Sequence, residues 1–279
     1  MLNSVKGKYD PIKAHHKAYV RRRYSKFQGK KIVDDKGLKK FIDEKLYDYQ
    51  SPKAIAGRLK KREKHLPYAS KDSIYRYIKS VHGRRVEAHR KRNRSRRRKR
   101  RARAGKLQDR TFIAKRPKII NTRSRIGDLE SDFIVSGKGG KGILLTAACR
   151  KSRTGFIERI IAVNIKNVHK AFVRIKRRFP EIKTITTDND LLLQRHKELE
   201  KLLGVKIYFC DPYSSWQKGT IENFNGQVRI YIPKGSNISK YSKRFIQRLE
   251  AKLNRRIMKC LNYRTPQEVL TKHRITKST

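Results

Sequence analysis

The stretch that decides the fold is residues 184–226, where two polar motifs flank a helix-like segment and a strand. The first motif ends a β-branched run and reads Thr184-Ile185-Thr186-Thr187-Asp188-Asn189. The second reads Asp211-Pro212-Tyr213-Ser214-Ser215-Trp216-Gln217-Lys218-Gly219-Thr220-Ile221-Glu222-Asn223-Phe224-Asn225-Gly226. Asp188 is therefore expected at a strand end, Glu222 in a later helix, and Asp132 midway along a strand at 129–135. Carboxylates on three separate elements converge only through a fold, and that is how a two-metal phosphoryl-transfer site is built.

These motifs resemble the catalytic core of the IS-thirty family of bacterial insertion-sequence transposases, within the class of Asp-Asp-Glu transposases and retroviral-type integrases. The family core reads roughly Trp-Glu-Gly-Asp, then Thr-Thr-Asp-Asn-Gly, then Asp-Pro-Tyr-Ser-Pro-Trp-Gln-Arg-Gly-x-Asn-Glu-Asn-x-Asn-Gly. This chain matches most of it, with Ser215 where the family has Pro and Ile221 where Asn is usual. The resemblance runs from about Tyr9 to the C-terminus and is most specific over residues 211–235.

The charge of the chain indicates its partner. Among 279 residues, 75 are Lys or Arg and 23 are Asp or Glu, which gives a net charge of +52. Such a charge repels itself unless a polyanion is present, and nucleic acid is the expected one. The longest apolar run, residues 143–149, is too short to span a bilayer, and the N-terminus has no signal-like segment. Three distant cysteines match neither a zinc site nor a disulfide framework, so a reduced, cytoplasmic, nucleoid-associated location is expected.

A small helix-turn-helix domain is expected at residues 36–82, after a basic arm at 1–35. Helical spacing covers residues 37–49, Ser51 and Pro52 start a second helix, and Ser70 caps a third. Ile74, Ile78 and Val81 are expected to face inward on that third helix. Its opposite face would enter a DNA major groove, presenting Lys71, Ser73, Arg76 and Lys79. The run at residues 51–59 resembles the family's Ser-Pro-x-x-Ile-x-Gly-Arg-Leu.

A basic linker is expected at residues 83–125. The part from 83 to 106 has almost no apolar residues and should be disordered when free, as an extended or weakly helical tether that contacts DNA phosphates without reading sequence. Its densest charges are Arg94, Arg96, Arg97, Arg98, Lys99, Arg100, Arg101 and Arg103.

The catalytic core is expected at residues 126–235, followed by a C-terminal helical segment at 236–279 with a helix at 243–259. Strands are expected at 129–135, 142–149 and 155–163, a helix at 168–179, a strand ending at Asp188, a helix to Leu203, a strand at 205–210, and a helix from Lys218. The order β-β-β-α-β-α-β-α is that of an α/β ribonuclease-H-like fold, which the resemblance also implies.

The resemblance implies that Asp132, Asp188 and Glu222 hold two Mg²⁺ or Mn²⁺ ions for DNA cleavage. Such ions take oxygen ligands, and no covalent nucleophile is needed. Alternation along a strand puts Asp128, Glu130 and Asp132 on one face, so the residues alone leave the choice among these three open, and the family motif selects Asp132.

Residues around Glu222 are expected to position the DNA. Trp216 either packs in the core or offers a stacking platform for an unpaired base. Asn225 and Arg229 lie one helical turn apart and are placed to contact one phosphate. The expected DNA-contacting set here is Trp216, Lys218, Asn223, Asn225 and Arg229.

The resemblance implies a DNA transposase that binds double-stranded element ends and target DNA as a homo-oligomer, away from membranes. Two departures stand out: the chain begins after the family's usual first helix-turn-helix, and Asp190 replaces the usual Gly after Asn189. A first alternative is a truncated relative that only binds DNA. A second is a basic RNA-binding protein, against which the acid triad and the absence of RNA-recognition aromatics count.

Overall fold

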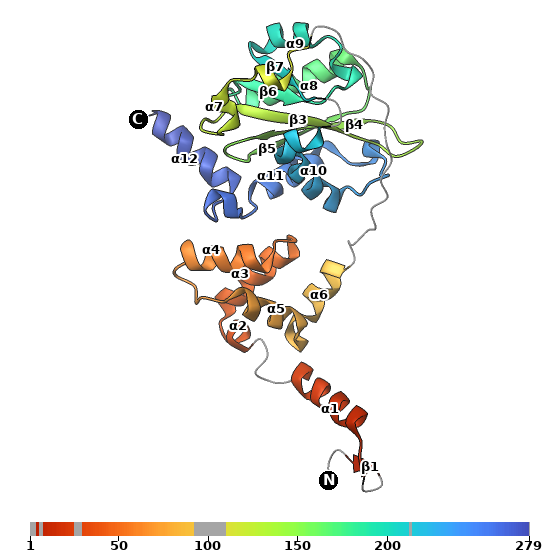
Figure 1. Cartoon of the computed structure of the whole chain (residues 1–279), viewed down its shortest axis with the longest axis vertical. Helices are drawn as coiled ribbons and strands as arrows, with labels where there is room; N and C mark the ends of the chain where they lie inside the picture. Colours follow the sequence, from red (N-terminus) through yellow and green to blue (C-terminus); the bar gives the residue numbers. More distant parts are fainter. Residues whose placement is uncertain (1–3, 6–7, 25–29, 92–109, 212–213, 279) are drawn as a thin grey trace. The chain divides into compact units, whose positions relative to one another are not determined.

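The computed structural model describes residues 4–5, 8–24, 30–91, 110–211 and 214–278 (Figure 1). The chain divides into two compact units. The helical unit comprises Met1–Arg98 with Ile257–Arg264, and the sheet unit comprises Lys99–Arg256 with Thr265–Thr279. The basic run at residues 94–103, expected to be a tether, lies outside the described residues.

The helical unit is built on a core of capped helices. A short antiparallel pair, β1 (Ser4–Val5) and β2 (Lys8–Tyr9), precedes α1 (Pro11–Tyr24), α2 (Lys30–Asp34), α3 (Lys36–Tyr47), α4 (Pro52–Lys61) and α5 (Lys71–Lys79). Ser51 accepts from the Ala54 N–H at 3.2 Å, and Ser70 accepts from the Ser73 N–H at 3.1 Å, so both predicted helix starts are confirmed.

The inward face of α5 differs from the prediction at one position. Ile74 and Ile78 are buried as predicted, but Val81 lies beyond the helix and is 36% exposed. The third buried side chain is Tyr77, whose hydroxyl donates to the Asp43 carboxylate at 2.7 Å. A tyrosine fills this place because the ring packs in the core while its hydroxyl finds a polar partner.

The helical unit extends further than the tether prediction allowed. Residues 81–83 form a short turn, η1 (Val81–Gly83), and α6 follows at Arg84–Lys91. Val86 is buried in the helical core, and the Arg90 guanidinium donates to the carbonyls of Leu46 and Gln50 at 3.1 and 2.9 Å. The expectation of a disordered tether from residue 83 is therefore wrong for residues 84–91, because a single apolar anchor and backbone acceptors order this helix.

A segment late in the sequence also belongs to the helical unit. The predicted helix at 243–259 ends early, as α11 (Lys243–Asn254), and a turn, η6 (Lys259–Leu261), follows in the segment Ile257–Arg264. The Ile257 N–H donates to the Gln50 side chain at 3.1 Å, and Arg58 donates to the Tyr263 carbonyl at 3.1 Å. A methyl group at Gly57 would lie 1.9 Å from the Tyr263 ring, so the glycine permits this close packing.

The sheet unit contains five strands in the order β5-β4-β3-β6-β7. They are β3 (Asp128–Val135), β4 (Ile143–Cys149), β5 (Gly155–Ile160), β6 (Thr184–Thr187) and β7 (Lys206–Phe209). Strands β3, β4 and β5 form an antiparallel meander, while β6 runs parallel to β3 and β7 parallel to β6. This mixed sheet, with helices after its third, fourth and fifth strands, is the predicted ribonuclease-H-like arrangement.

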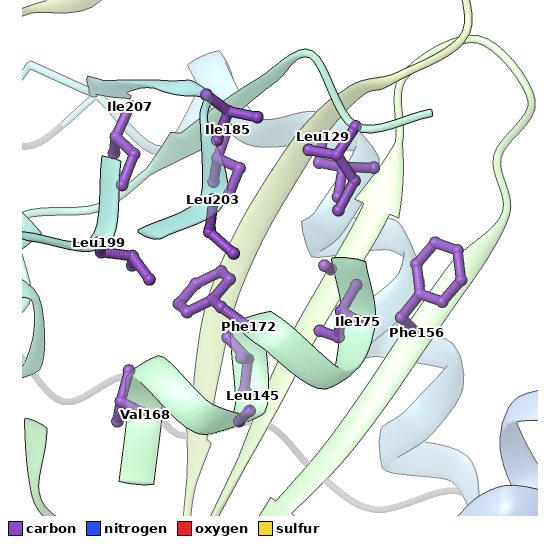
Figure 2. Close-up of a cluster of buried hydrophobic side chains, with 14 of the residues drawn as sticks. Leu129, Leu145, Phe156, Val168, Phe172, Ile175, Ile185, Leu199, Leu203 and Ile207 are labelled. Carbon is purple, nitrogen blue, oxygen red and sulfur yellow. The ribbon is translucent and has the colours of Figure 1, made fainter. Parts of the chain in front are cut away.

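Helices cover both faces of the sheet (Figure 1). Alternate side chains of β4 point to opposite faces: Leu145 packs with α8 (Ile165–Arg178) and α9 (His196–Leu203), and Leu144 packs with α10 (Gly219–Tyr231) and α11. Figure 2 shows the first of these cores, where Phe172 of α8 points toward the strands. The second core fixes the helix that carries Glu222.

Both sheet edges are covered by other parts of the same unit. On β5, the Asn254 side chain bonds both backbone groups of Gly155 at 2.8 Å, and Glu250 accepts from the Ile157 N–H at 2.6 Å. On β7, the Phe209 N–H donates to the Thr111 carbonyl at 2.9 Å, and Glu200 accepts from the Ile207 N–H. Residues 110–121, with η2 (Ile113–Lys115) and α7 (Lys118–Asn121), are thus packed on the sheet, whereas the sequence indicated a linker as far as residue 125.

The last helix, α12 (Pro266–Ser278), is tied to the sheet unit by an ion pair. The Arg274 guanidinium lies 2.7 Å from the Glu181 carboxylate, and Leu270 packs against the first core. The hydrogen bond from Arg274 holds the pKa of Glu181 below its usual range. Within the described residues, no helix is long and apolar enough to cross a membrane.

This pair should make stability depend on pH. A carboxyl group whose pKa is lowered on folding stabilises the fold fully above the ordinary glutamate pKa of about 4.3. This stabilisation is lost as the pH falls through the lowered pKa. Arg274→Gln should therefore reduce the free energy of unfolding by up to about 1 kcal/mol at neutral pH, since the pair is partly exposed. The deficit should shrink in acid. Urea denaturation on both sides of the glutamate pKa tests this, with the exposed Arg244→Gln as control; a deficit that does not change with pH would contradict it.

Candidate active site

The sheet brings two of the predicted acids side by side. Asp132 lies in β3, and Asp188 follows the last residue of the neighbouring parallel strand β6, where Glu130 is in register with Thr186. The Lys218 ammonium lies between them, 3.5 Å from Asp132 Oδ1 and 3.2 Å from Asp188 Oδ2. Both carboxylates reach solvent, with side chains 31% and 58% exposed. The parallel pairing of β3 with β6 thus creates an open acidic edge.

Asp132 points to the sheet face on which α10 packs, and Asn225 of that helix donates to its carboxylate; the same helix carries Glu222. Glu222 stands in the first turn of α10 and is exposed. Partial burial raises its pKa, and the negative charges of Asp132, Glu130 and Asp188 raise it further, while Lys218 acts in the opposite direction. The pKa of Asp132 is likewise raised, first by burial and then by Asp188, against the lowering effect of Lys218. The mutual influence shows that the three acids share one electrostatic environment.

The structure distinguishes among the three acids on β3. Asp128 is buried and accepts from Arg125 Nε at 3.0 Å and from the Thr184 hydroxyl at 2.7 Å. Glu130 is buried, and both of its carboxylate oxygens have partners. Asp132 alone among them has a partly exposed carboxylate at the acidic edge, so the geometry favours the residue that the motif selects.

Glu130 fixes the start of the helix that carries Glu222. Its carboxylate accepts from the N–H groups of Thr220 and Ile221 at 2.8 and 3.0 Å, and it pairs with the buried guanidinium of Arg150. A negative charge at a helix N-terminus satisfies free N–H groups and interacts favourably with the helix dipole. Sequence reasoning missed this role. The signals were an acid on the face of β3 shared with Asp132, and an arginine, Arg150, directly after a mostly apolar strand.

The carboxylate oxygens of the acidic edge are the kind of ligand that a divalent cation prefers. Two carboxylates flank a buried positive charge, and hard divalent ions prefer such oxygen ligands. Among the described residues, however, no group of three or more His, Cys, Asp or Glu side chains is arranged to hold a metal. Instead, the ammonium of Lys218, whose side chain is only 4% exposed, lies between Asp132 and Asp188.

Comparison with known proteins identifies the family. The chain is 36% identical over 268 residues to the transposase for insertion sequence element IS4351 of Bacteroides fragilis, covering 94% of this chain and 80% of the relative. The chain belongs to the IS-thirty family of insertion-sequence transposases. It is also 33% identical over 248 residues to transposase InsI for insertion sequence element IS30A of Escherichia coli (strain K12), covering 84% of this chain and 64% of the relative.

The chain was also compared with solved structures and with protein-family models. The catalytic core domain of BIV integrase is 18% identical with a TM-score of 0.43, covering 55% of this chain and 99% of that one. No family model matches the chain.

The loop after Asp188 has Asp190 at the position where the IS-thirty family usually has glycine. Asp190 adopts an extended backbone, φ −91°, and its side chain accepts from the Leu192 N–H at 2.9 Å, which caps a short turn, η3 (Leu191–Leu193). Asn189 donates to the Cys210 carbonyl at 2.9 Å and accepts from Arg110. The loop is held by side-chain hydrogen bonds, so no left-handed residue is needed there.

The residues predicted to position DNA take different places. Trp216, in the turn η4 (Ser215–Lys218), is 75% exposed, so the core-packing alternative is wrong. Asn225 donates to Asp132 Oδ2 at 2.9 Å. Burial lowers the pKa of Arg229, and the negative charge of Asp132 acts in the opposite direction. Asn223 is exposed. Lys218 differs from its predicted place because two carboxylates hold its ammonium inside the site.

In the helical unit, the predicted DNA-facing residues lie on the outer side of α5. Lys71, Arg76 and Lys79 are exposed, opposite buried Ile74 and Tyr77. Ser73 is half-buried, with its hydroxyl 3.0 Å from the Ser70 hydroxyl, so the turn that it closes already occupies it.

The buried pair of Glu130 and Arg150 should be a major source of stability. Glu130→Ala leaves an unpaired charge in the interior and removes the helix cap, so we expect a loss of about 3–5 kcal/mol in the free energy of unfolding. Glu198→Ala is the control, because it breaks an exposed pair with Arg195 and should cost less than about 1 kcal/mol. Chemical denaturation of both variants measures the difference; equal losses would contradict the assigned role.

Proposed function

We propose that this transposase cleaves DNA strands and transfers them to target DNA, using Asp132, Asp188 and Glu222. The proposal is supported by Asp132 and Asp188, which lie on either side of the Lys218 ammonium at a solvent-open edge, and by Glu222 on α10, the helix whose Asn225 contacts Asp132. In a chain of net charge +52, acids gathered around one buried cation are a local exception. Family membership supports the same reaction class.

Divalent cations, Mg²⁺ or Mn²⁺, would be held by these three carboxylates and would polarise the scissile phosphate and activate the attacking oxygen. The protein's own contribution is positional. Asn225 orients Asp132 by its hydrogen bond, and Glu130 fixes the helix start from which Glu222 projects. Arg229, within reach of the Asp132 charge, would bind a phosphate of the cleaved strand together with Asn225. Trp216, exposed beside α10, offers an unpaired base a surface for stacking.

Conservative substitutions of the acids should separate catalysis from binding. Asp132→Asn, Asp188→Asn and Glu222→Gln keep the side-chain size but remove the charge. Each should reduce strand cleavage at least about 100-fold, since metal-ion catalysis supplies several kcal/mol. Affinity for DNA should be retained. The measurements are cleavage of labelled duplex in Mg²⁺ and a binding titration in chelator, with Glu198→Gln as control. Normal cleavage by Glu222→Gln would refute the assignment and favour a relative that only binds DNA.

We further propose that the helical unit binds double-stranded DNA through α5. Its exposed face presents Lys71, Arg76 and Lys79 opposite the buried core residues, which is the arrangement of a helix that lies in a major groove. The run at residues 94–103 would add phosphate contacts without sequence preference. Element ends and target DNA are the expected partners, a homo-oligomer on DNA the expected assembly, and the nucleoid the expected location.

Charge removal on α5 tests this proposal. Arg76→Ala combined with Lys79→Ala should weaken DNA binding and lower the slope of log affinity against log salt by up to about 1.8, at about 0.9 per phosphate contact. The matched control is Lys40→Ala with Lys60→Ala, two exposed lysines on α3 and α4. Affinity across a salt series and footprinting on element ends give the answer. An unchanged slope and footprint in the α5 variant would remove this helix from the interface.

A further inference from the structure

Lys218 differs from the other basic residues that were expected to bind DNA. Its side chain is 4% exposed, whereas Lys71, Arg76 and Lys79 are exposed. It ends the turn η4, immediately before the first residue of α10. An ammonium group removed from water is costly unless it is paired and hydrogen-bonded. Its position therefore needs an explanation.

The explanation lies in the two acids. Lys218 Nζ is 3.5 Å from Asp132 Oδ1 in β3 and 3.2 Å from Asp188 Oδ2, directly after β6. Burial alone would lower the pKa of Lys218, but Asp132 and Asp188 outweigh burial and raise it, so the group carries its charge. Without that charge, the neighbouring carboxylates would repel each other.

The ammonium and a divalent cation require the same oxygens. A metal held by Asp132 and Asp188 would be within a few ångströms of Lys218 Nζ, where like charges repel strongly at a partly buried site. The Lys218 ammonium can move into solvent, because the Asp188 side chain beside it is 58% exposed and the four-carbon stem of lysine is flexible. Gly219, the next residue, has open space where a side chain would be.

We infer that Lys218 is an exchangeable internal cation: it neutralises Asp132 and Asp188 in the metal-free protein and leaves when a divalent ion binds between them. This inference rests on the proposed function of the two acids as metal ligands. The released ammonium emerges beside the metal, where the scissile phosphate must lie, and becomes a phosphate contact. Lys218 is then a positioning residue in the free protein and a DNA contact in the loaded one. Metal binding and DNA binding are coupled through this one side chain.

The test compares Mg²⁺ affinity among variants of the full chain by titration calorimetry. Lys218→Met keeps the stem and removes the competing charge, so it should bind Mg²⁺ about tenfold more tightly than the wild type, a difference of about 1.4 kcal/mol. Lys218→Arg keeps the charge and should return the affinity toward the wild-type value. Lys234→Met, an exposed lysine beyond the end of α10, should have no effect. Equal or weaker Mg²⁺ binding by Lys218→Met than by Lys234→Met would overturn the inference.

A second measurement uses the wild-type chain and does not depend on the folding of a variant. Amine acylation followed by peptide mass spectrometry should label Lys218 slowly in chelator and severalfold faster in Mg²⁺. Lys234 should be labelled equally in both conditions. Protection of Lys218 that is unchanged by saturating Mg²⁺ would show a permanent structural ion pair, and the exchange would be refuted.

Asp188→Asn separates this inference from the proposed function. If the acids bind metal, Asp188→Asn loses Mg²⁺ affinity whatever Lys218 does. Loss of affinity in Asp188→Asn together with an unchanged affinity in Lys218→Met would leave the active site standing and refute only the exchange. Unchanged affinity in Asp188→Asn would refute both.

Discussion

The structure of the candidate active site depends on one buried carboxylate, that of Glu130. It receives the first free N–H groups of α10 and the guanidinium of Arg150, which also donates to the Ile120 carbonyl of α7. A strand, a helix start and the strand-flanking segment before β3 therefore meet at one charge. Because Glu130 and Asp132 are separated by only one residue of β3, the same interaction that anchors α10 also sets where Glu222 stands relative to Asp132. The precision of the site comes from backbone N–H groups, which cannot rotate away as a side chain can.

Much of this arrangement could be predicted from local sequence. Strand positions followed from apolar runs and turns, and the helix starts at Ser51 and Ser70 followed from their capping side chains. Asp188 and Glu222 followed from motif order. These features depend on near neighbours in the chain, for which sequence patterns are informative. Residues 84–91 were misjudged because one buried valine, Val86, and hydrogen bonds to a distant helix end outweigh a strongly basic composition.

The roles that sequence could not predict all involve long-range charge pairing. The pairing of Glu130 with Arg150 joins two strands, and the place of Lys218 depends on acids more than 25 positions upstream. Composition supplied a partial guide, since acids are scarce in this chain. Elsewhere several of them are held by arginine, such as Glu158, Glu250 and Glu181, whereas Glu222 makes no ion pair or hydrogen bond to any described residue.

The covered edges of the sheet restrict how copies of this transposase can associate. A sheet recruits a strand from another molecule through a row of free N–H and C=O groups on its outermost strand. Here the outward groups of Gly155 and Ile157 are taken by Asn254 and Glu250, and those of Ile207 and Phe209 by Glu200 and Thr111. Continuous sheets across two molecules are thereby disfavoured, and so is the fibrillar self-association that free edges invite. Any association between copies of this chain would therefore use surfaces other than the sheet edges.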